Sequence, residues 1–307
     1  MDIRACARSS APQDERRRDT LALMIRQISV IGTGTMGRGI AYLSAVAGYQ
    51  TFVYDVEQSA LDSARASLES TLRKGVEKSK INADDASAAL ERVKFLPELE
   101  PAVSSADLII EAVPESYDLK VELFAQADVF CEEHTIMASN TSSISITSLA
   151  KNVERRERFV GLHFFNPPHV MKLIEIVRGE RTSDLTVQMV REVAERMGKT
   201  PIVVQDSPGF ASSRLGVAIG LEAIRMLEEG VASAEDIDRA MELGYNHPMG
   251  PLRLTDLVGL DVRLGIAEYL ASTLGARFEP PQLLRTLVAE GKLGRKTGQG
   301  FYSWPAE

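Results

Sequence analysis

A glycine-rich turn between an expected strand and an expected helix constrains the fold of this chain most. Glycines at 32, 34 and 37 follow an apolar run at Gln27–Ile31 and precede a helical pattern that continues to Ala47. This is G-x-G-x-x-G in its required context of strand, turn and helix. The first glycine permits the tight turn, the second lets the backbone approach a pyrophosphate, and the third allows the helix to pack closely on the strand. The helix N-terminus offers N–H groups and a positive dipole to phosphates. These features predict a dinucleotide site.

An acidic residue ends the next expected strand. Gln50–Tyr54 is strand-like, and Asp55 follows it 23 residues after Gly32, near the roughly 20-residue spacing of the acid that binds ribose hydroxyls. A glycine-rich turn that binds nothing is the alternative, but strand, turn, helix, strand and acid in this order favour the nucleotide site. Asp55, with Glu57 nearby and no arginine immediately after it, disfavours a 2′-phosphate. NAD is therefore predicted over NADP.

Strand-like and helical segments alternate through the first two thirds of the chain. This alternation predicts an α/β fold with a Rossmann-type, doubly wound, mostly parallel sheet. From Phe210 onward the pattern is helical, which predicts an all-α C-terminal domain. We expect three regions: a disordered tail at 1–24, an NAD-binding domain at 25–205 and a helical domain at 206–307. Further strands are expected at Val93–Leu96, Leu108–Glu111, Ile136–Ser139 and Thr200–Val204, and helices at Leu61–Lys80, Tyr117–Val129, Phe210–Glu229, Ala234–Leu243, Leu252–Val258, Asp261–Leu274 and Pro281–Glu290.

Composition excludes several classes of protein. The formal charge of −8 with no dominant basic face argues against a nucleic-acid binder. No apolar run reaches the roughly 18 residues of a membrane span, so no membrane association is expected. The chain has two cysteines, Cys6 and Cys131, which excludes a disulfide framework and fits a reducing cytoplasm. No residues show metal-ligand spacing, so no metal is predicted. The N-terminal stretch is polar and aperiodic, and Met24 is an alternative natural start.

A histidine and a glutamate lie in two strand-like segments on either side of a turn. Phe159–Phe165 contains His163, Leu173–Val177 contains Glu175, and an Asn-Pro-Pro sequence between them forces the chain to turn. If the two strands pair, the carboxylate bonds one ring nitrogen and leaves the other as a base. A buried acid satisfied by backbone groups is the alternative for Glu175. An acid amid apolar strand residues needs a partner in either case.

The chain resembles the L-3-hydroxyacyl-CoA dehydrogenase family, in particular the short single-function 3-hydroxybutyryl-CoA type. The likeness runs from about Ile25 to the C-terminus. Its motifs occur in the family's order: GTGTMGRGIA, EAVPE at 111–115, SNTSSISIT at 139–147, GLHFFNPP at 161–168, LIEIV at 173–177, DSPGF at 206–210, HPMGPLRLTDLVGLD at 247–261 and GRKTGQGFY at 294–302.

The resemblance implies a reaction and roles for individual residues. It implies interconversion of L-3-hydroxyacyl-CoA and 3-ketoacyl-CoA with NAD, in fatty acid or butyrate metabolism, by a homodimer formed through the C-terminal domain. His163 would be the acid/base, Glu175 its orienting partner, and Ser139 the hydroxyl at the C3 oxygen. It further implies that NAD contacts Gly32, Gly34, Thr35, Met36, Gly37, Asp55, Glu115, Lys120, Ser139, Asn166 and Lys296, and that acyl-CoA contacts Thr71, Lys78, Lys120 and Ser139.

The chain departs from the family pattern at one site position. The family usually has Asn-Arg three residues after the Gly-Phe pair, and the asparagine helps to hold the substrate carbonyl. Here Ser213 occupies that position before Arg214. A serine hydroxyl can still donate a hydrogen bond, with shorter reach. Either a water bridges the gap or the carbonyl is held less tightly. Loss of one such donor costs about 10²-fold in rate at some sites, which leaves the role of Ser213 and the choice of substrate open.

Two other functions are compatible with the sequence. One is a related NAD-dependent dehydrogenase of a free hydroxy or sugar acid, of the gulonate-oxidising type. Basic residues at 73–80, which include Lys78, favour the CoA ester, although a solvated helix face is the alternative for any one lysine. The other is a non-catalytic NAD-binding relative, which the presence of Ser139, His163 and Glu175 disfavours.

Overall fold

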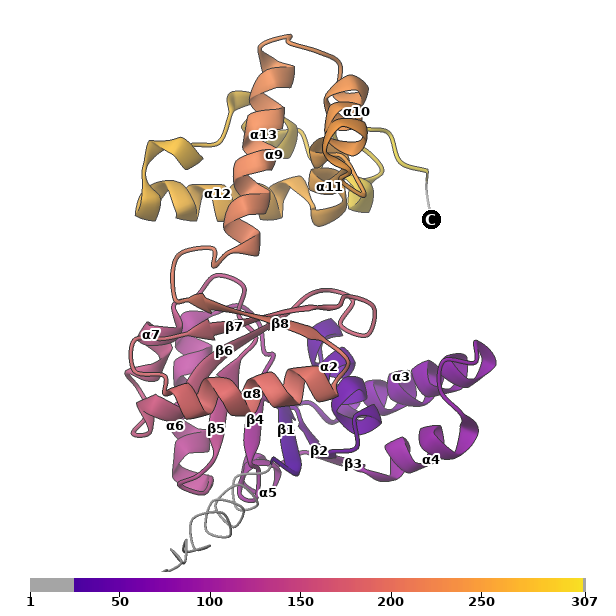
Figure 1. Cartoon of the computed structure of the whole chain (residues 1–307), viewed down its shortest axis with the longest axis vertical. Coiled ribbons are helices and arrows are strands. Elements are labelled where there is room, and N and C mark those ends of the chain that lie inside the picture. The colour runs from indigo at the N-terminus through magenta and orange to yellow at the C-terminus, as the bar shows by residue number, and fades with distance from the viewer. Residues whose placement is uncertain (1–24, 306–307) are drawn as a thin grey trace, which may run out of the picture. The chain divides into compact units, whose positions relative to one another are not determined.

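The computed structural model describes residues 25–305, and the predicted tail at 1–24 lies outside the described residues. These residues form two compact units (Figure 1). The first comprises residues 25–141 and 146–204, and the second comprises 142–145 and 205–305. The short segment 142–145 therefore belongs with the second unit although it lies within the first in sequence.

An eight-stranded sheet forms the centre of the first unit, with strand order β3-β2-β1-β4-β5-β6-β7-β8. Strands β1 to β6 pair in parallel, and β7 pairs antiparallel with β6. The predicted doubly wound, mostly parallel sheet is confirmed, and its strand order reverses between β1 and β4, where ligands bind in such sheets. The strands are β1 (Gln27–Ile31), β2 (Gln50–Tyr54), β3 (Val93–Leu96), β4 (Leu108–Glu111), β5 (Ile136–Ser139), β6 (Phe159–Phe164), β7 (Leu173–Arg178) and β8 (Thr200–Gln205).

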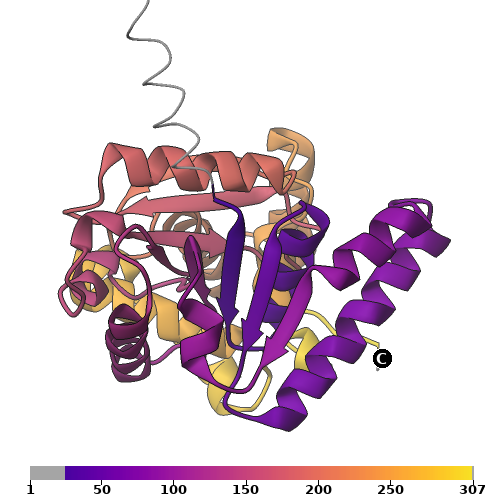
Figure 2. The ribbon, with the colours of Figure 1, turned by 90° about the horizontal axis from the view of Figure 1, so that it is seen from below.

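Helices connect and cover the strands of this unit (Figure 2). Helix α3 is amphipathic: Leu61, Leu68 and Leu72 are buried at helical spacing. Side chains cap two helices that were not expected from the sequence: Asn82 accepts a hydrogen bond at the start of α4, and Ser183 does so at the start of α8. The helical elements are α2 (Thr35–Val46), α3 (Gln58–Glu77), α4 (Ala83–Glu91), α5 (Leu99–Val103), α6 (Tyr117–Phe130), α7 (Ile146–Ala150), the 3₁₀ turn η1 (Arg156–Arg158) and α8 (Asp184–Arg196).

Alternation along β6 determines which way the histidine points. Val160 and Leu162 belong to the same buried cluster as Val190 of α8. Phe159 instead packs against Phe124 of α6, with ring centroids 4.7 Å apart. Successive strand residues face opposite sides of a sheet. His163, which has the parity of Phe159, therefore lies on the face opposite α8.

The second unit is helical, as predicted. Two buried carboxylates hold its C-terminal segment: Asp256 accepts hydrogen bonds from the backbone of Phe301 and the indole of Trp304, and Asp238 accepts one from the hydroxyl of Tyr302. Its elements are α9 (Ser212–Glu228), α10 (Ala234–Tyr245), α11 (Pro251–Val258), α12 (Leu260–Leu274), η2 (Ala276–Phe278), α13 (Gln282–Ala289) and η3 (Arg295–Thr297). Among the helices that the structure describes, none is both long and apolar enough to cross a membrane.

Candidate active site

The predicted histidine and glutamate contact each other directly. Strands β6 and β7 place His163 opposite Glu175 in register, and His163 Nδ1 lies 2.8 Å from Glu175 Oε2. Both side chains are buried, and the ring of Phe165 lies 4.5 Å from that of the histidine. Because a carboxylate only accepts, Nδ1 carries the proton and a neutral imidazole keeps its lone pair on Nε2. The predicted strand pairing is therefore confirmed.

A second buried group links the ends of β4 and β5. These parallel strands place Glu111 beside Ser139, and the Ser139 hydroxyl donates to Glu111 Oε2 at 2.6 Å. The ammonium of Lys120, from α6, is ion-paired with Glu111 Oε1. Burial raises the pKa of the Glu111 carboxyl, while the charge of Lys120 lowers it. All three side chains are fully or almost fully buried, so each depends on the others to satisfy its polar atoms.

Glu115 borders this group on its more exposed side. Its Oε2 lies 3.4 Å from Lys120 Nζ, and its Oε1 accepts a 2.5 Å hydrogen bond from Thr141. The structure thus brings together three residues predicted to contact NAD, Glu115, Lys120 and Ser139. It places Lys120 within the protein as the counter-ion of two carboxylates.

The glycine-rich turn lines a cavity of about 770 Å³ together with Asp55. Gly32 has φ +97°, a conformation that favours glycine, and a Cβ on Gly37 would lie 1.8 Å from the Gly32 carbonyl oxygen. A Cβ on Gly34 would meet no atom within 4 Å. Gly32 therefore permits the turn, Gly37 allows the helix to pack closely on the strand, and Gly34 leaves open space at the N-terminus of α2. These residues fit a dinucleotide pyrophosphate.

Hydrogen bonds fix the carboxylate of Asp55 at the edge of this cavity. Its Oδ2 accepts from the backbone and hydroxyl of Thr33 at 2.8 and 2.7 Å, and its Oδ1 accepts from the backbone of Glu57. Thr35 and Met36 also line the cavity. A fixed, negatively charged acceptor suits ribose hydroxyls and opposes a 2′-phosphate.

A smaller cavity, of about 230 Å³, is lined by two further predicted residues and again by Thr35. Thr35, Thr71 and Asn166 line it, together with Tyr42 and His169. The structure thus brings Thr71, predicted for CoA, beside Asn166, predicted for NAD. Lys78 lies at the C-terminal end of α3 and is exposed.

Two predicted residues lie in the second unit. Ser213 is half-buried in the first turn of α9. Lys296, in η3, is ion-paired with Asp261 Oδ2 at 2.6 Å. These positions neither confirm nor contradict the predicted contact of Ser213 with the substrate carbonyl or that of Lys296 with NAD.

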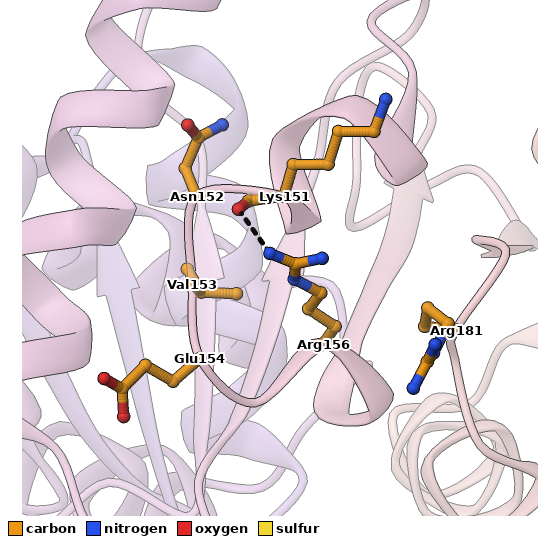
Figure 3. A pocket seen from close by; sticks show the side chains of 6 residues that line it. All are labelled: Lys151, Asn152, Val153, Glu154, Arg156 and Arg181. Carbon is orange, nitrogen blue, oxygen red and sulfur yellow. Dashed lines mark hydrogen bonds between the residues drawn. The ribbon is translucent and has the colours of Figure 1, made fainter.

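A different pocket, of about 470 Å³, contains none of the predicted site residues. Figure 3 shows it beside the loop that follows α7, where Arg156 donates a hydrogen bond to the carbonyl of Lys151. Its remaining lining residues are Asn152, Val153, Glu154 and Arg181.

Glu111 and Asn140 lie at strand ends, and the sequence predicts no role for either. Glu111 joins Ser139 to Lys120, and the Asn140 side chain accepts a hydrogen bond from Phe164 N at 2.9 Å. Asn140 therefore ties the end of β5 to the end of β6. The available signal was the strand order, because parallel neighbours end at the same edge of the sheet.

Comparisons with known proteins agree with this arrangement. Residues 27–207 match the NAD binding domain of 3-hydroxyacyl-CoA dehydrogenase, and residues 209–304 match its C-terminal domain. A probable 3-hydroxybutyryl-CoA dehydrogenase of Bacillus subtilis is 45% identical over 91% of this chain and 98% of its own length. The mitochondrial hydroxyacyl-coenzyme A dehydrogenase of Sus scrofa is 40% identical over 92% of each chain.

A solved structure gives the same result. The crystal structure of (S)-3-hydroxybutyryl-CoA dehydrogenase from Ralstonia eutropha has a TM-score of 0.89 and 43% identity, and the match covers 92% of this chain and 100% of that one. The family models, the sequence relatives and the solved structure all indicate the same family, and the sheet and the cavity at the glycine-rich turn fit its NAD binding domain. The chain therefore belongs to the 3-hydroxyacyl-CoA dehydrogenase family of NAD-dependent oxidoreductases.

Proposed function

We propose that this protein interconverts L-3-hydroxyacyl-CoA and 3-ketoacyl-CoA, with short acyl chains as its substrates. The observation that carries this proposal is the 2.8 Å hydrogen bond between His163 Nδ1 and Glu175 Oε2. It supplies an oriented imidazole in a chain whose family binds NAD. The glycine-rich turn and Asp55 would hold NAD, which would supply the hydride acceptor for oxidation and, as NADH, the hydride donor for reduction.

His163 is the proposed acid/base. In the oxidative direction its Nε2 takes the proton of the 3-hydroxyl, and the buried Glu175 carboxylate stabilises the imidazolium that forms. In reduction the imidazolium returns the proton to the oxygen of the ketone. The orientation of the ring costs nothing at the moment of reaction, because the strand register already holds both partners.

Ser139 is the proposed contact of the substrate oxygen. Its hydroxyl donates to Glu111 in this structure, and rotation about the Cβ–Oγ bond redirects that hydrogen bond to the substrate. Glu111 then keeps hydrogen bonds from Lys120 and from the backbone of Val113. Both of these hydrogen bonds go to Oε1, so Oε2 loses its donor when the Ser139 hydroxyl turns to the substrate, and the ion pair with Lys120 stabilises the carboxylate that remains.

The predicted homodimer and cytoplasmic location are part of the same proposal. On one face of α9, Ala223 is buried in the core, but Leu215 and Ile219 are 63% and 38% exposed. Exposed apolar residues on one helix face favour contact with a second copy. Light scattering at micromolar concentration should give the mass of a dimer, and a monomer there would contradict this part.

One assay separates the candidate functions. Purified protein is given NADH and, in separate reactions, acetoacetyl-CoA, free acetoacetate and, with NAD, L-gulonate. We expect turnover of the CoA ester alone, and weaker turnover when NADPH replaces NADH. Turnover of either free acid in preference to the ester would support the free-acid dehydrogenase, and no turnover of any substrate would support the non-catalytic relative.

A further inference from the structure

Lys199 is a buried lysine whose ammonium binds two backbone carbonyls. It lies immediately before β8 and is 9% exposed. The ammonium donates to the carbonyl of Pro168 at 2.5 Å and to that of Met171 at 2.8 Å. Within the part of the chain that the structure describes, it forms no ion pair with a carboxylate. Burial lowers the pKa of this ammonium, and a buried charge is costly unless it is hydrogen-bonded. The two carbonyls therefore stabilise it.

Both carbonyls belong to the loop that joins β6 to β7, the two strands that carry the dyad. The loop comprises residues 165–172. Its turn is closed by hydrogen bonds from the backbone N–H groups of Val170 and Met171 to the carbonyl of Pro167, each 3.0 Å long. Among the described residues, no other side chain donates to a carbonyl of this loop. The side chain of Lys199 therefore ties the turn to the start of β8.

Helix α2 contacts the same turn. A Cβ built on Gly39 would lie 2.7 to 2.9 Å from three atoms of the Pro168 ring. This is closer than side chains pack, so the ring of Pro168 lies directly on the backbone of the helix. Helix α2 is the one that begins at the glycine-rich turn. The loop is thus held by Lys199 and by the helix that lines the cofactor cavity.

The loop carries Asn166, which the sequence predicts as a contact of NAD. Asn166 is exposed and lines the 230 Å³ cavity together with Thr35. Thr35 also lines the larger cavity at the glycine-rich turn. The Asn166 side chain makes no hydrogen bond to the described residues. Its position therefore depends on the backbone of the loop, which Lys199 holds two residues further on, at Pro168.

We propose that Lys199 is a positioning residue for the cofactor: by holding the carbonyls of Pro168 and Met171, it keeps Asn166 in place to contact NAD. This inference deepens the proposed function and rests on the NAD contact that the family resemblance implies for Asn166. The dyad is held separately, because the register of β6 and β7 pairs its two residues outside the loop. A displaced loop therefore weakens the binding of NAD more than it slows the chemical step.

An apolar side chain of similar length tests the proposal. Lys199→Met leaves both carbonyls without their donor. In the protein without cofactor, we expect faster hydrogen–deuterium exchange at the amides of Val170 and Met171. The Kd of NADH, measured by fluorescence titration, should rise about 10-fold, as expected for loss of a charge-assisted hydrogen bond. The kcat at saturating NADH and acetoacetyl-CoA should stay within about 3-fold.

Lys151→Met is the matched control for the loss of a lysine charge. Lys151 is exposed and lines the separate pocket of Figure 3. We expect this variant to change neither the exchange of the loop amides nor the Kd of NADH.

A double-mutant cycle shows whether the effect passes through Asn166. Asn166→Ala alone should raise the Kd of NADH by about 10-fold. Adding Lys199→Met to it should raise the Kd by less than about 2-fold more, because the contact that Lys199 positions is already absent. A purely structural role for Lys199 would lower the melting temperature and the active fraction, and it would not produce this non-additivity.

A second variant keeps the test valid if Lys199→Met does not fold. Gly39→Ala forces a methyl group into the ring of Pro168, while alanine favours the helix over glycine. It should raise the Kd of NADH and speed exchange at the same loop amides, and the effect on Kd should again disappear when Asn166→Ala is present. Gly244→Ala, in α10, is its control, because a Cβ there meets no atom within 4 Å. That variant should change neither quantity.

The outcomes separate this inference from the proposed function. If Lys199→Met leaves the Kd of NADH within about 2-fold, or if its effect adds in full to that of Asn166→Ala, the inference is overturned. An unchanged Kd in Asn166→Ala alone also overturns it, because the loop then carries no contact of NAD. If the binding and exchange results hold but the wild-type protein does not turn over acetoacetyl-CoA, the proposed function fails and the role of Lys199 in cofactor binding is supported.

Discussion

The Ser139 hydroxyl, at the end of β5, donates a 2.6 Å hydrogen bond to Glu111, at the end of the neighbouring parallel strand β4. Lys120 completes the group from α6, and its ammonium is ion-paired with the same carboxylate. The proposed substrate contact is therefore held by a buried ion pair. Glu111 therefore contributes to stability, because it neutralises the buried ammonium of Lys120, and to the proposed activity, because it holds the hydroxyl of Ser139.

Breaking this ion pair from either side should destabilise the protein. Glu111→Gln leaves a buried ammonium, and Lys120→Met leaves a buried carboxylate, so each should lower the free energy of unfolding by about 3–5 kcal/mol. Glu115, 3.4 Å from Lys120 but 40% exposed, offsets little of this. Urea unfolding of both variants and of the double variant forms a double-mutant cycle. The double variant should lose much less than the two single losses together, and additive losses would contradict the coupling.

Substitution at the histidine should remove chemistry while leaving cofactor binding intact. His163→Gln keeps a polar side chain but no acid/base group, so kcat for acetoacetyl-CoA should fall by about 10²- to 10⁴-fold. The Kd of NADH, measured by fluorescence titration, should stay within about 2-fold, because the glycine-rich cavity is lined by other residues. Turnover at the wild-type rate would rule out the proposed acid/base.

Glu175→Gln tests the orienting role separately. It keeps an oxygen that can accept from Nδ1 but removes the charge that stabilises the imidazolium. We expect a smaller loss of kcat than for His163→Gln, because the ring keeps a hydrogen-bond partner at Nδ1. Normal turnover would leave Glu175 with a structural role only.

The glycines at 34 and 37 should respond oppositely to alanine. In Gly34→Ala the new methyl group meets no protein atom within 4 Å, so the melting temperature should hold while the Kd of NADH rises about 10-fold or more, because the methyl group occupies space required by the pyrophosphate. Gly37→Ala drives its Cβ into the carbonyl of Gly32 at 1.8 Å. That variant should lose several degrees in melting temperature. Equal effects on folding and binding in both variants would contradict the assigned roles.

The sheet and the contact between His163 and Glu175 follow from the sequence because both depend on local patterns. Apolar runs locate the strands, and the alternation that places His163 opposite Glu175 is a property of any antiparallel pair. Helix α8 was missed although Val187, Val190 and Val193 are buried and Ser183 caps it. The spacing of these valines and the capping serine are local signals that the sequence already contains, so this helix was predictable in the same way as the strands.

Arg263 shows what a sequence alone does not contain. An arginine in the first turn of a helix is usually exposed, but Arg263 of α12 is 8% exposed. Its burial depends on how α12 packs against α9, and its contact with Gly216 depends on the rotation of both helices. The role of Glu111 is hidden for the same reason, because the partners of a buried acid are set by strand order rather than by its neighbours in sequence.

Acid should destabilise the protein in part through His169. Its ring lies edge-on to Tyr42, with centroids 6.1 Å apart, and burial, together with the charges of Lys199 and Lys80, lowers the pKa of the imidazole below its usual 6.5. In the window between the lowered pKa and about 6.5 the unfolded chain binds more protons than the folded one. The free energy of unfolding therefore falls as pH falls through that window.

The variant His169→Gln removes this titration. We expect the wild-type protein to lose more stability than the variant between about pH 7.5 and about pH 5, as measured by the midpoint of urea unfolding at each pH. The difference in unfolding midpoint between the two proteins should therefore become smaller toward the acidic end, because the variant has no imidazole whose protonation opposes folding. A constant difference between them across this range would show that His169 does not contribute to the pH dependence.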